Sequence, residues 1–288
     1  MNPSDDQLFH TKNYGKGGPQ LLIELPHGAV NTEEYQFFAQ QIPSLPENLI
    51  DFFYVNTDVG TPELAHCIAQ NLKEHMRISI IRSRIPRTLV DCNRVLSLSP
   101  EEYRAGKVTP GIPCYVPQQD HEWLHQIHQR YTKKVDELYA SICQQGGSAL
   151  ILHSYSPKSV GISSVDQDIV EKLHWAYEAD LYKTWPTRPK IDIIAKTKEG
   201  EWLCDMKRAE KLQQAYIQND ITVGLSQTYP MHPSTMAFRH AKKYPSQIIC
   251  LEIRRDLLMK EFLPFAPMYA CQKKIEKHAQ TITKAYRQ

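Results

Sequence analysis

The chain has 288 residues, and its 34 basic residues nearly balance its 32 acidic ones, which leaves a formal net charge of +2. A net charge this close to zero does not favour a polyanionic partner such as nucleic acid. No stretch approaches the roughly 18 consecutive apolar residues of a membrane-spanning helix. The segment 1–20 is polar and lacks the apolar core of a secretory signal.

The seven cysteines are far apart in the sequence and form no Cys-x-x-Cys pair. An odd number without close spacing indicates free thiols in a reducing compartment. We therefore expect a cytoplasmic protein without a membrane partner.

Short apolar runs alternate along the chain with longer segments of helical periodicity. The predicted strands are 21–25, 51–56, 77–81, 148–152, 191–195, 221–225 and 247–253, and the predicted helices are 63–75, 118–144 and 268–286. The segment 97–117 is rich in proline and glycine and has no periodicity, and such long loops are often functional. Strands that alternate with helices predict an α/β fold with one mixed, mostly parallel sheet flanked by helices, and we expect a single domain over residues 1–288.

Polar side chains follow several of the predicted strands. His27 follows the first strand, Asp58 follows the second, and His153 follows the strand 148–152. Ligands of such sheets bind at the carboxyl ends of the strands, so two histidines and a carboxylate from these ends are able to build an open zinc site. The alternative is that each histidine is a hydrogen-bonded residue at the sheet edge.

Two further clusters contain charged residues. The segment 87–94 reads RTLVDCNR, and its two arginines favour bidentate binding of a carboxylate; the alternative is a structural loop in which Asp91 holds an arginine. The segment 251–256 reads LEIRRD, and strand alternation places Glu252 and Arg254 on one face. A carboxylate in such an apolar run is costly unless it is functional or paired with an arginine.

The order and spacing of these clusters resemble the N-formylglutamate amidohydrolase family. The matching segments cover residues 21–258 and read PHG at 26–28, DVG at 58–60, ELA at 63–65, RTLVDCNR at 87–94, HS at 153–154, the stretch 229–240, and LEIRRDL at 251–257. The resemblance implies a zinc-carboxypeptidase-like fold and a zinc site made by His27, Asp58 and His153. Glu63 is the competing acidic ligand.

The resemblance also implies roles for the remaining residues of these segments. Glu252 would be the general base, and Arg87 would stabilise the oxyanion. Substrate binding would fall to four residues: Asn93, Arg94, His240 and Arg254. The implied reaction is zinc-assisted hydrolysis of the amide bond of a small N-acyl amino acid that bears a carboxylate. N-formyl amino acids are among the substrates that the resemblance implies.

The sequence departs from the family pattern at two places, and one of them is the pair Ala29-Val30, which follows the first motif in place of a small, polar continuation. The family usually has an acidic residue two positions before the second histidine, and Ile151 stands there; a carboxylate near a ligating histidine normally orients its ring. We expect a divergent member of the family. Two alternatives stay open: a peptidase or cell-wall amidase with the same zinc chemistry, and a metal-free binding protein that retains the fold.

Overall fold

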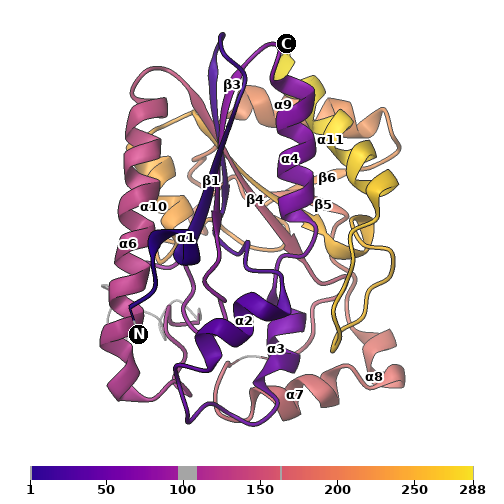
Figure 1. Cartoon of the computed structure of the whole chain (residues 1–288). Coiled ribbons are helices and arrows are strands. Elements are labelled where there is room, and N and C mark those ends of the chain that lie inside the picture. Colours follow the sequence, from indigo (N-terminus) through magenta and orange to yellow (C-terminus); the bar gives the residue numbers. More distant parts are fainter. Residues whose placement is uncertain (1, 97–108, 163, 288) are drawn as a thin grey trace.

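The computed structural model contains a mixed sheet of seven strands, and it describes residues 2–96, 109–162 and 164–287 (Figure 1). The strands lie in the order β1-β3-β2-β4-β7-β5-β6. Only the β1–β3 and β5–β7 pairs are antiparallel, as predicted for a mostly parallel sheet. The strands are β1 (Phe9–Tyr14), β2 (Gln20–Leu25), β3 (Arg77–Ser83), β4 (Ser148–Tyr155), β5 (Ile191–Ile193), β6 (Val223–Leu225) and β7 (Ile248–Arg254).

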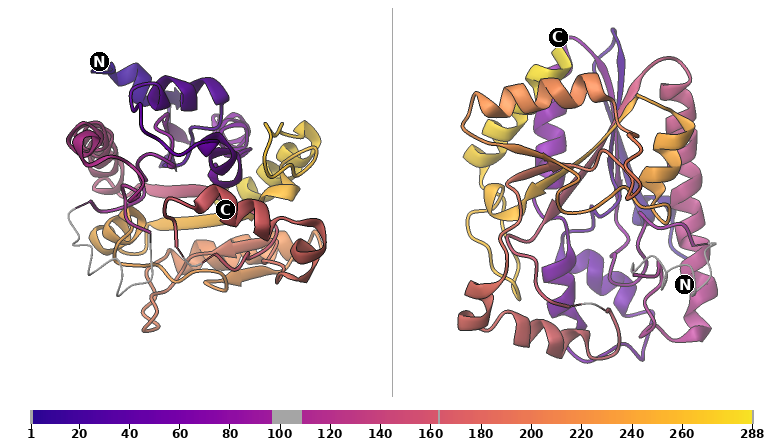
Figure 2. Two further views of the ribbon diagram at one scale, coloured as in Figure 1. Left: turned by 90° about the horizontal axis from the view of Figure 1, so that it is seen from below. Right: turned by 180° about the vertical axis from the view of Figure 1, so that it is seen from behind.

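Helices cover both faces of the sheet (Figure 2). One face packs against α4 (Thr61–Leu72), α9 (Met206–Ile217) and α11 (Gln272–Arg287), and the other packs against α6 (Gln118–Cys143) and α10 (Met236–Lys243). The described part of the chain also contains shorter helices: α1 (Asp5–Leu8), α2 (Thr32–Ala39), α3 (Leu49–Asn56), α7 (Ile169–Ala176), α8 (Ala179–Thr184) and the 3-10 turn η1 (Arg255–Leu257). Of these, α2, α3, α7 and α8 gather at one end of the sheet (Figure 1).

Strand β4 lies at the centre of the sheet and is buried along its whole length. Ala149 and Ile151 point into the core beneath α6, whereas Leu150 and Leu152 point into the opposite core. A parallel strand buried on both faces has a continuous apolar sequence rather than an alternating one. The same rule explains the apolar runs of β2 and β7.

The prediction of a strand at 51–56 is wrong, because this segment forms helix α3. Its aromatic residues favour a strand, but Leu49, Phe52 and Val55 recur at the spacing of a helix face and are buried. Short apolar runs do not distinguish the two structures. The other six predicted strands and the three predicted helices are confirmed, with shifted ends.

Several elements were not predicted, and β1 is the clearest case. It is an edge strand with only Phe9 buried, so it lacks an apolar pattern.

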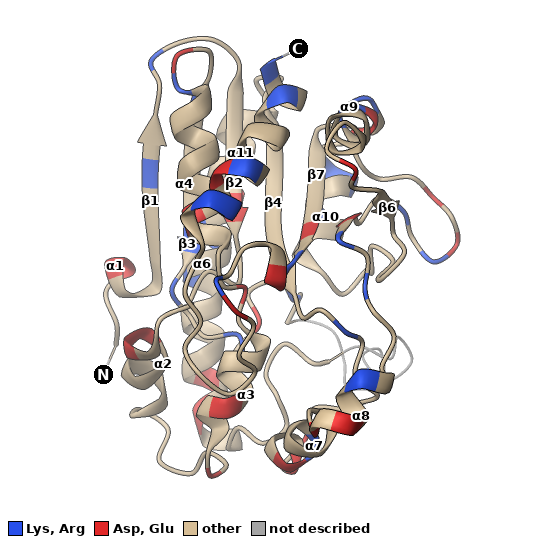
Figure 3. Cartoon of the chain, turned by 90° about the vertical axis from the view of Figure 1, so that its right-hand side faces the viewer, with Lys and Arg blue, Asp and Glu red and all other residues tan. Residues whose placement is uncertain are grey.

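Of the predicted loop 97–117, residues 97–108 lie outside the described part of the chain. Basic and acidic residues are interspersed along the ribbon in Figure 3, in keeping with the small net charge. Among the described helices, none combines the length and the hydropathy needed to cross a bilayer.

Candidate metal centre and substrate pocket

Three elements bring His27, Asp58 and His153 together. His27 lies two residues after the end of β2. His153 lies near the carboxyl end of β4, the strand that pairs with β2. Asp58 comes from the connection between α3 and α4, not from a strand end as expected. All three residues are at most 4% exposed.

The ligand atoms of this triad converge on one point. Nδ1 of His27 is 3.1 Å from Nδ1 of His153. Oδ2 of Asp58 is 3.3 Å from the first nitrogen and 2.9 Å from the second. Ligands held about 2.0–2.1 Å from a tetrahedral zinc ion are about 3.3 Å from one another. Two imidazoles and a carboxylate at these separations fit a divalent metal such as zinc, and the group is one that could hold such an ion.

Asp91 supports the first histidine of the triad. Nε2 of His27 is 2.7 Å from Oδ1 of Asp91, and an imidazole that donates through Nε2 presents an unprotonated Nδ1. Metal-binding histidines commonly donate their other ring N–H to a carboxylate in this way. The sequence analysis considered Asp91 only as a partner for an arginine and missed this contact.

Charges around the triad favour the ionised carboxylates. Burial and Arg87 both oppose a charge on His27, but Asp91 and Asp58 together raise its pKa above the ordinary value. Burial opposes the charge of Asp58 as well, yet His27 and His153 lower its pKa. An acidic ligand that stays ionised is ready to bind a cation.

Glu252 lies next to His153 on the neighbouring strand. The two residues are paired in register between β4 and β7, and Leu251 and Ile253 point into the opposite core. Oε2 of Glu252 is buried and has no hydrogen-bond partner among the described residues. Burial raises the pKa of Glu252 to about 7, so this carboxyl group is suited to exchange a proton near neutral pH.

Arg87, Asn93 and Arg94 line the same pocket. A guanidinium nitrogen of Arg87 is 3.2 Å from Asp91 and another is 4.0 Å from Asp58. The Asn93 side chain accepts from the backbone N–H of Ala237 and places its nitrogen 3.5 Å from Nε2 of His153. Arg94 donates to the carbonyl of Thr109 and lies 4.0 Å from Asp91.

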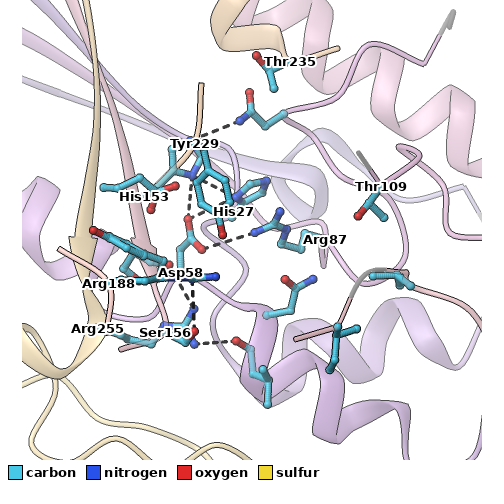
Figure 4. Close-up of a pocket in the computed structure, with 18 of the residues that line it drawn as sticks. His27, Asp58, Arg87, Thr109, His153, Ser156, Arg188, Tyr229, Thr235 and Arg255 are labelled. Carbon is cyan, nitrogen blue, oxygen red and sulfur yellow. Dashed lines mark hydrogen bonds and ion pairs between the residues drawn. The ribbon is translucent and has the colours of Figure 1, made fainter. Parts of the chain in front are cut away.

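The pocket is a cavity of about 530 Å³ with a polar and an apolar wall, and Figure 4 shows part of the polar wall. The triad, Glu252 and the arginines form the polar wall. Ile162, Val165, Ile169 and Leu173 contribute an apolar wall. The sequence analysis gave no role to several polar residues that line this cavity, among them Arg188, Tyr229 and Arg255.

Three residues considered in the sequence analysis do not line the pocket. Glu63 opens α4 with an exposed side chain and is outside the group able to hold a metal, which leaves Asp58 as the acidic member. His240 is buried and stacks on Tyr139 at 3.8 Å between ring centroids. Arg254 forms a bidentate pair with Asp256.

The layer of the core that contains Ile151 holds a carboxylate on a different strand. Ile151 is paired in register with Glu24 of β2. Glu24 is buried and accepts hydrogen bonds from Tyr139 at 2.7 Å and Tyr131 at 3.3 Å, both on α6. The residue that departs from the family pattern is therefore an ordinary part of the core beneath α6.

The fold and the site together define an α/β domain with a candidate metal centre in a pocket near the carboxyl ends of its central parallel strands. The sequence model of the N-formylglutamate amidohydrolase family matches residues 21–259, and the chain belongs to this family. No curated protein sequence matches the chain.

Two solved structures share the fold along nearly the whole length. N-formylglutamate amidohydrolase from Ralstonia eutropha JMP134 is similar with a TM-score of 0.59 and 14% identity, over 98% of each chain. A gene product from Agrobacterium tumefaciens is similar with a TM-score of 0.60 and 15% identity, over 100% of this chain and 98% of that one. Identities this low show the shared fold alone.

Proposed function

We propose that the protein is a zinc-dependent amidohydrolase that cleaves the amide bond of an N-acyl amino acid bearing a carboxylate. The observation that carries the proposal is the convergence of His27, Asp58 and His153 within one pocket, beside the unpaired carboxylate of Glu252. Family membership supports hydrolysis of a carbon–nitrogen bond other than a peptide bond. The free thiols of all seven cysteines support the proposed cytoplasmic location.

His27, Asp58 and His153 would hold the zinc ion. When bound, zinc polarises a carbonyl group and lowers the pKa of a water molecule. Glu252 accepts the proton of the attacking water and passes it to the leaving nitrogen as the carbon–nitrogen bond breaks. The products are the carboxylate of the acyl group and the free amine of the amino acid.

Arg87 is proposed to donate hydrogen bonds to the carbonyl oxygen as this oxygen becomes negatively charged, and its place in the pocket lining supports this role. Loss of one such donor typically slows a reaction about 100- to 1000-fold. Asn93 and Arg94 are proposed to contact the carboxylate of the substrate. We do not assign His240 or Arg254 to this pocket, because their side chains lie outside it.

Zinc content and a substrate screen test the proposal together. The purified protein is loaded with zinc and offered N-formyl, N-acetyl and N-succinyl amino acids, with short peptides as the alternative substrates. We expect one zinc ion per chain and release of an amino acid from at least one N-acyl compound. Cleavage of peptides alone would favour the peptidase, and failure to bind zinc would favour a metal-free binding protein.

Glu252→Gln tests the base. Gln keeps the size of the side chain but does not accept the proton, so we expect turnover to fall at least about 100-fold with zinc content unchanged. Glu63→Gln is the matched control, since Glu63 is exposed and outside the pocket. Full turnover in a zinc-loaded Glu252→Gln variant would remove Glu252 from the mechanism.

A further inference from the structure

Arg188 lines the pocket, but among the described residues no carboxylate forms a hydrogen bond or a salt bridge with it. It lies in the connection between α8 and β5. In Figure 4, Arg87 and Arg188 approach the pocket from opposite sides. An arginine inside a pocket without a carboxylate partner is a candidate receptor for an anion.

The other arginines of the pocket are engaged by protein groups. Arg87 and Arg94 both lie close to the carboxylate of Asp91. Arg255 is buried and donates to the backbone carbonyls of Val55 and Ser154. Arg188 differs from Arg87 and Arg94 because its hydrogen-bond partners are two neutral hydroxyl groups, and it differs from Arg255 because it is only partly buried.

The backbone of Arg188 is fixed from both sides. Its N–H donates to the carbonyl of Pro157 at 2.9 Å. Its carbonyl accepts a hydrogen bond from Nη1 of Arg254 at 3.2 Å, and Asp256 holds Arg254 in turn. Arg254 thus positions the segment that carries Arg188.

The side chain of Arg188 is fixed as well. Nε donates to the hydroxyl of Ser159 at 3.0 Å, and Nη1 donates to the hydroxyl of Ser156 at 3.3 Å. The guanidinium carbon is 5.3 Å from the ring centroid of Tyr155 and 5.5 Å from that of Tyr229. Nη2 makes no hydrogen bond to the described residues. The guanidinium is therefore held in place while the N–H groups of Nη2 can still donate to a ligand.

We propose that Arg188 is a further specificity-determining residue, which binds the carboxylate of the substrate together with Asn93 and Arg94. The proposal rests on the proposed function, which supplies a carboxylate-bearing substrate, and it adds a receptor that the sequence did not suggest. Serine hydroxyls and tyrosine rings hold the guanidinium without forming an ion pair with it. The carboxylate of a bound substrate would supply the negative charge of such a pair. The scissile amide would then lie between Arg188 and the triad of His27, Asp58 and His153.

A binding experiment with charged and neutral probes tests the assignment. The probes are N-formyl-L-glutamate, N-acetyl-L-leucine and the neutral amide of each, in which every carboxylate is a carboxamide, titrated by calorimetry into the zinc-loaded Glu252→Gln protein to avoid turnover. We expect Arg188→Ala to weaken binding of the carboxylates about 10- to 100-fold, and that of the neutral carboxamides less than about 3-fold. Arg188→Lys should give an intermediate loss, since it keeps the charge without the planar fork.

Arg208→Ala is the matched control. Arg208 lies on α9 outside the pocket and stacks on Tyr286 at 4.2 Å, so the variant also removes an arginine that rests on a tyrosine ring. It should leave the binding of all four probes unchanged. Zinc content should be the same in every variant.

Equal losses for carboxylates and carboxamides in Arg188→Ala, or no loss for either, would overturn the assignment. So would a failure of the parent protein to bind any of the four probes. Binding of carboxylates that depends on Arg188, without hydrolysis of any N-acyl amino acid, would leave the assignment standing and refute the proposed function. Hydrolysis that does not depend on Arg188 would refute the assignment alone.

Discussion

At the scale of single residues, Glu252 has an environment in the pocket that disfavours its charge. Its carboxyl group is buried beside Asp58, which is a second negative charge. His153, Arg188 and Arg87 favour the ionised form of Glu252, but burial outweighs them and raises its pKa from 4.5 to about 7. The metal-free protein therefore holds a carboxyl group that resists ionisation.

This environment predicts how stability depends on pH. The unfolded chain releases the proton near pH 4.5 and the folded chain near pH 7, so the ionised group destabilises the fold increasingly as pH rises through this window. Glu252→Gln should thus increase the free energy of unfolding by a few kcal/mol at pH 8 and by much less at pH 5. Urea unfolding with a chelator present measures both values.

Glu63→Gln serves again as the control, because its exposed carboxylate should give almost no difference between pH 5 and pH 8. A loss of stability at pH 8 in Glu252→Gln would contradict the prediction and indicate that the carboxylate has a structural partner.

At the scale of elements, the position of Asp58 depends on the connection between α3 and α4. Arg255 joins the last turn of α3 to β4, because it donates to the carbonyls of Val55 and Ser154. Gly60 ends the connection with a φ of 89°, in the left-handed region. A Cβ atom at Gly60 would lie 2.5 Å from Cε of Met259 and 2.8 Å from Cβ of Leu258.

Gly60→Ala should therefore both destabilise the protein and weaken the metal site. The strained φ alone costs about 1–3 kcal/mol, and the close contacts push the backbone that carries Asp58. We expect a lower urea midpoint and weaker zinc binding in a competition titration with a fluorescent chelator.

Gly146→Ala separates the two effects. Gly146 also has a positive φ of 78°, but no atom would lie within 4 Å of its Cβ, and it is far from Asp58 in the sequence. It should lower stability by the backbone strain and leave zinc affinity unchanged. Equal zinc affinity in the two variants would show that the connection does not control Asp58.

At the scale of the whole molecule, the three proposed ligands come from separate segments that only the folded chain brings together. Zinc should then bind the folded state in preference to the unfolded one and raise the melting temperature. At a free concentration 100-fold above the dissociation constant, the gain is about 2.7 kcal/mol.

The gain should be larger at pH 8 than at pH 6. Asp91 and Asp58 raise the pKa of His27, and a protonated imidazole does not bind a metal, so protons compete with zinc as pH falls. Thermal unfolding at both pH values, with zinc and with a chelator, measures the difference. His153→Ala should abolish the zinc-dependent rise, and the exposed His174→Ala should keep it. A rise that survives in His153→Ala would place the ion elsewhere.

The sequence predicts those parts of the fold whose signal is local. The central strands β2, β4 and β7 have continuous apolar runs, and the histidines and glutamate at their ends stand out against them. Helix α3 was mistaken for a strand because its burial depends on packing against α7, which a short window does not contain. Arg188 lies in a coil between prolines, and its role depends on tyrosines 33 and 41 residues away on either side, Tyr155 and Tyr229.

The arrangement around Asp91 limits how this site can diverge. One carboxylate serves the ring of His27, the guanidinium of Arg87 and the backbone N–H of Asn93. A substitution of Asp91 would therefore disturb the metal ligand and the groups on the substrate side at once. Among the described residues, no hydrogen bond joins the side chains of the apolar wall at Ile162, Val165, Ile169 and Leu173 to Asp91, so substitutions in this wall should change substrate preference while the triad stays intact.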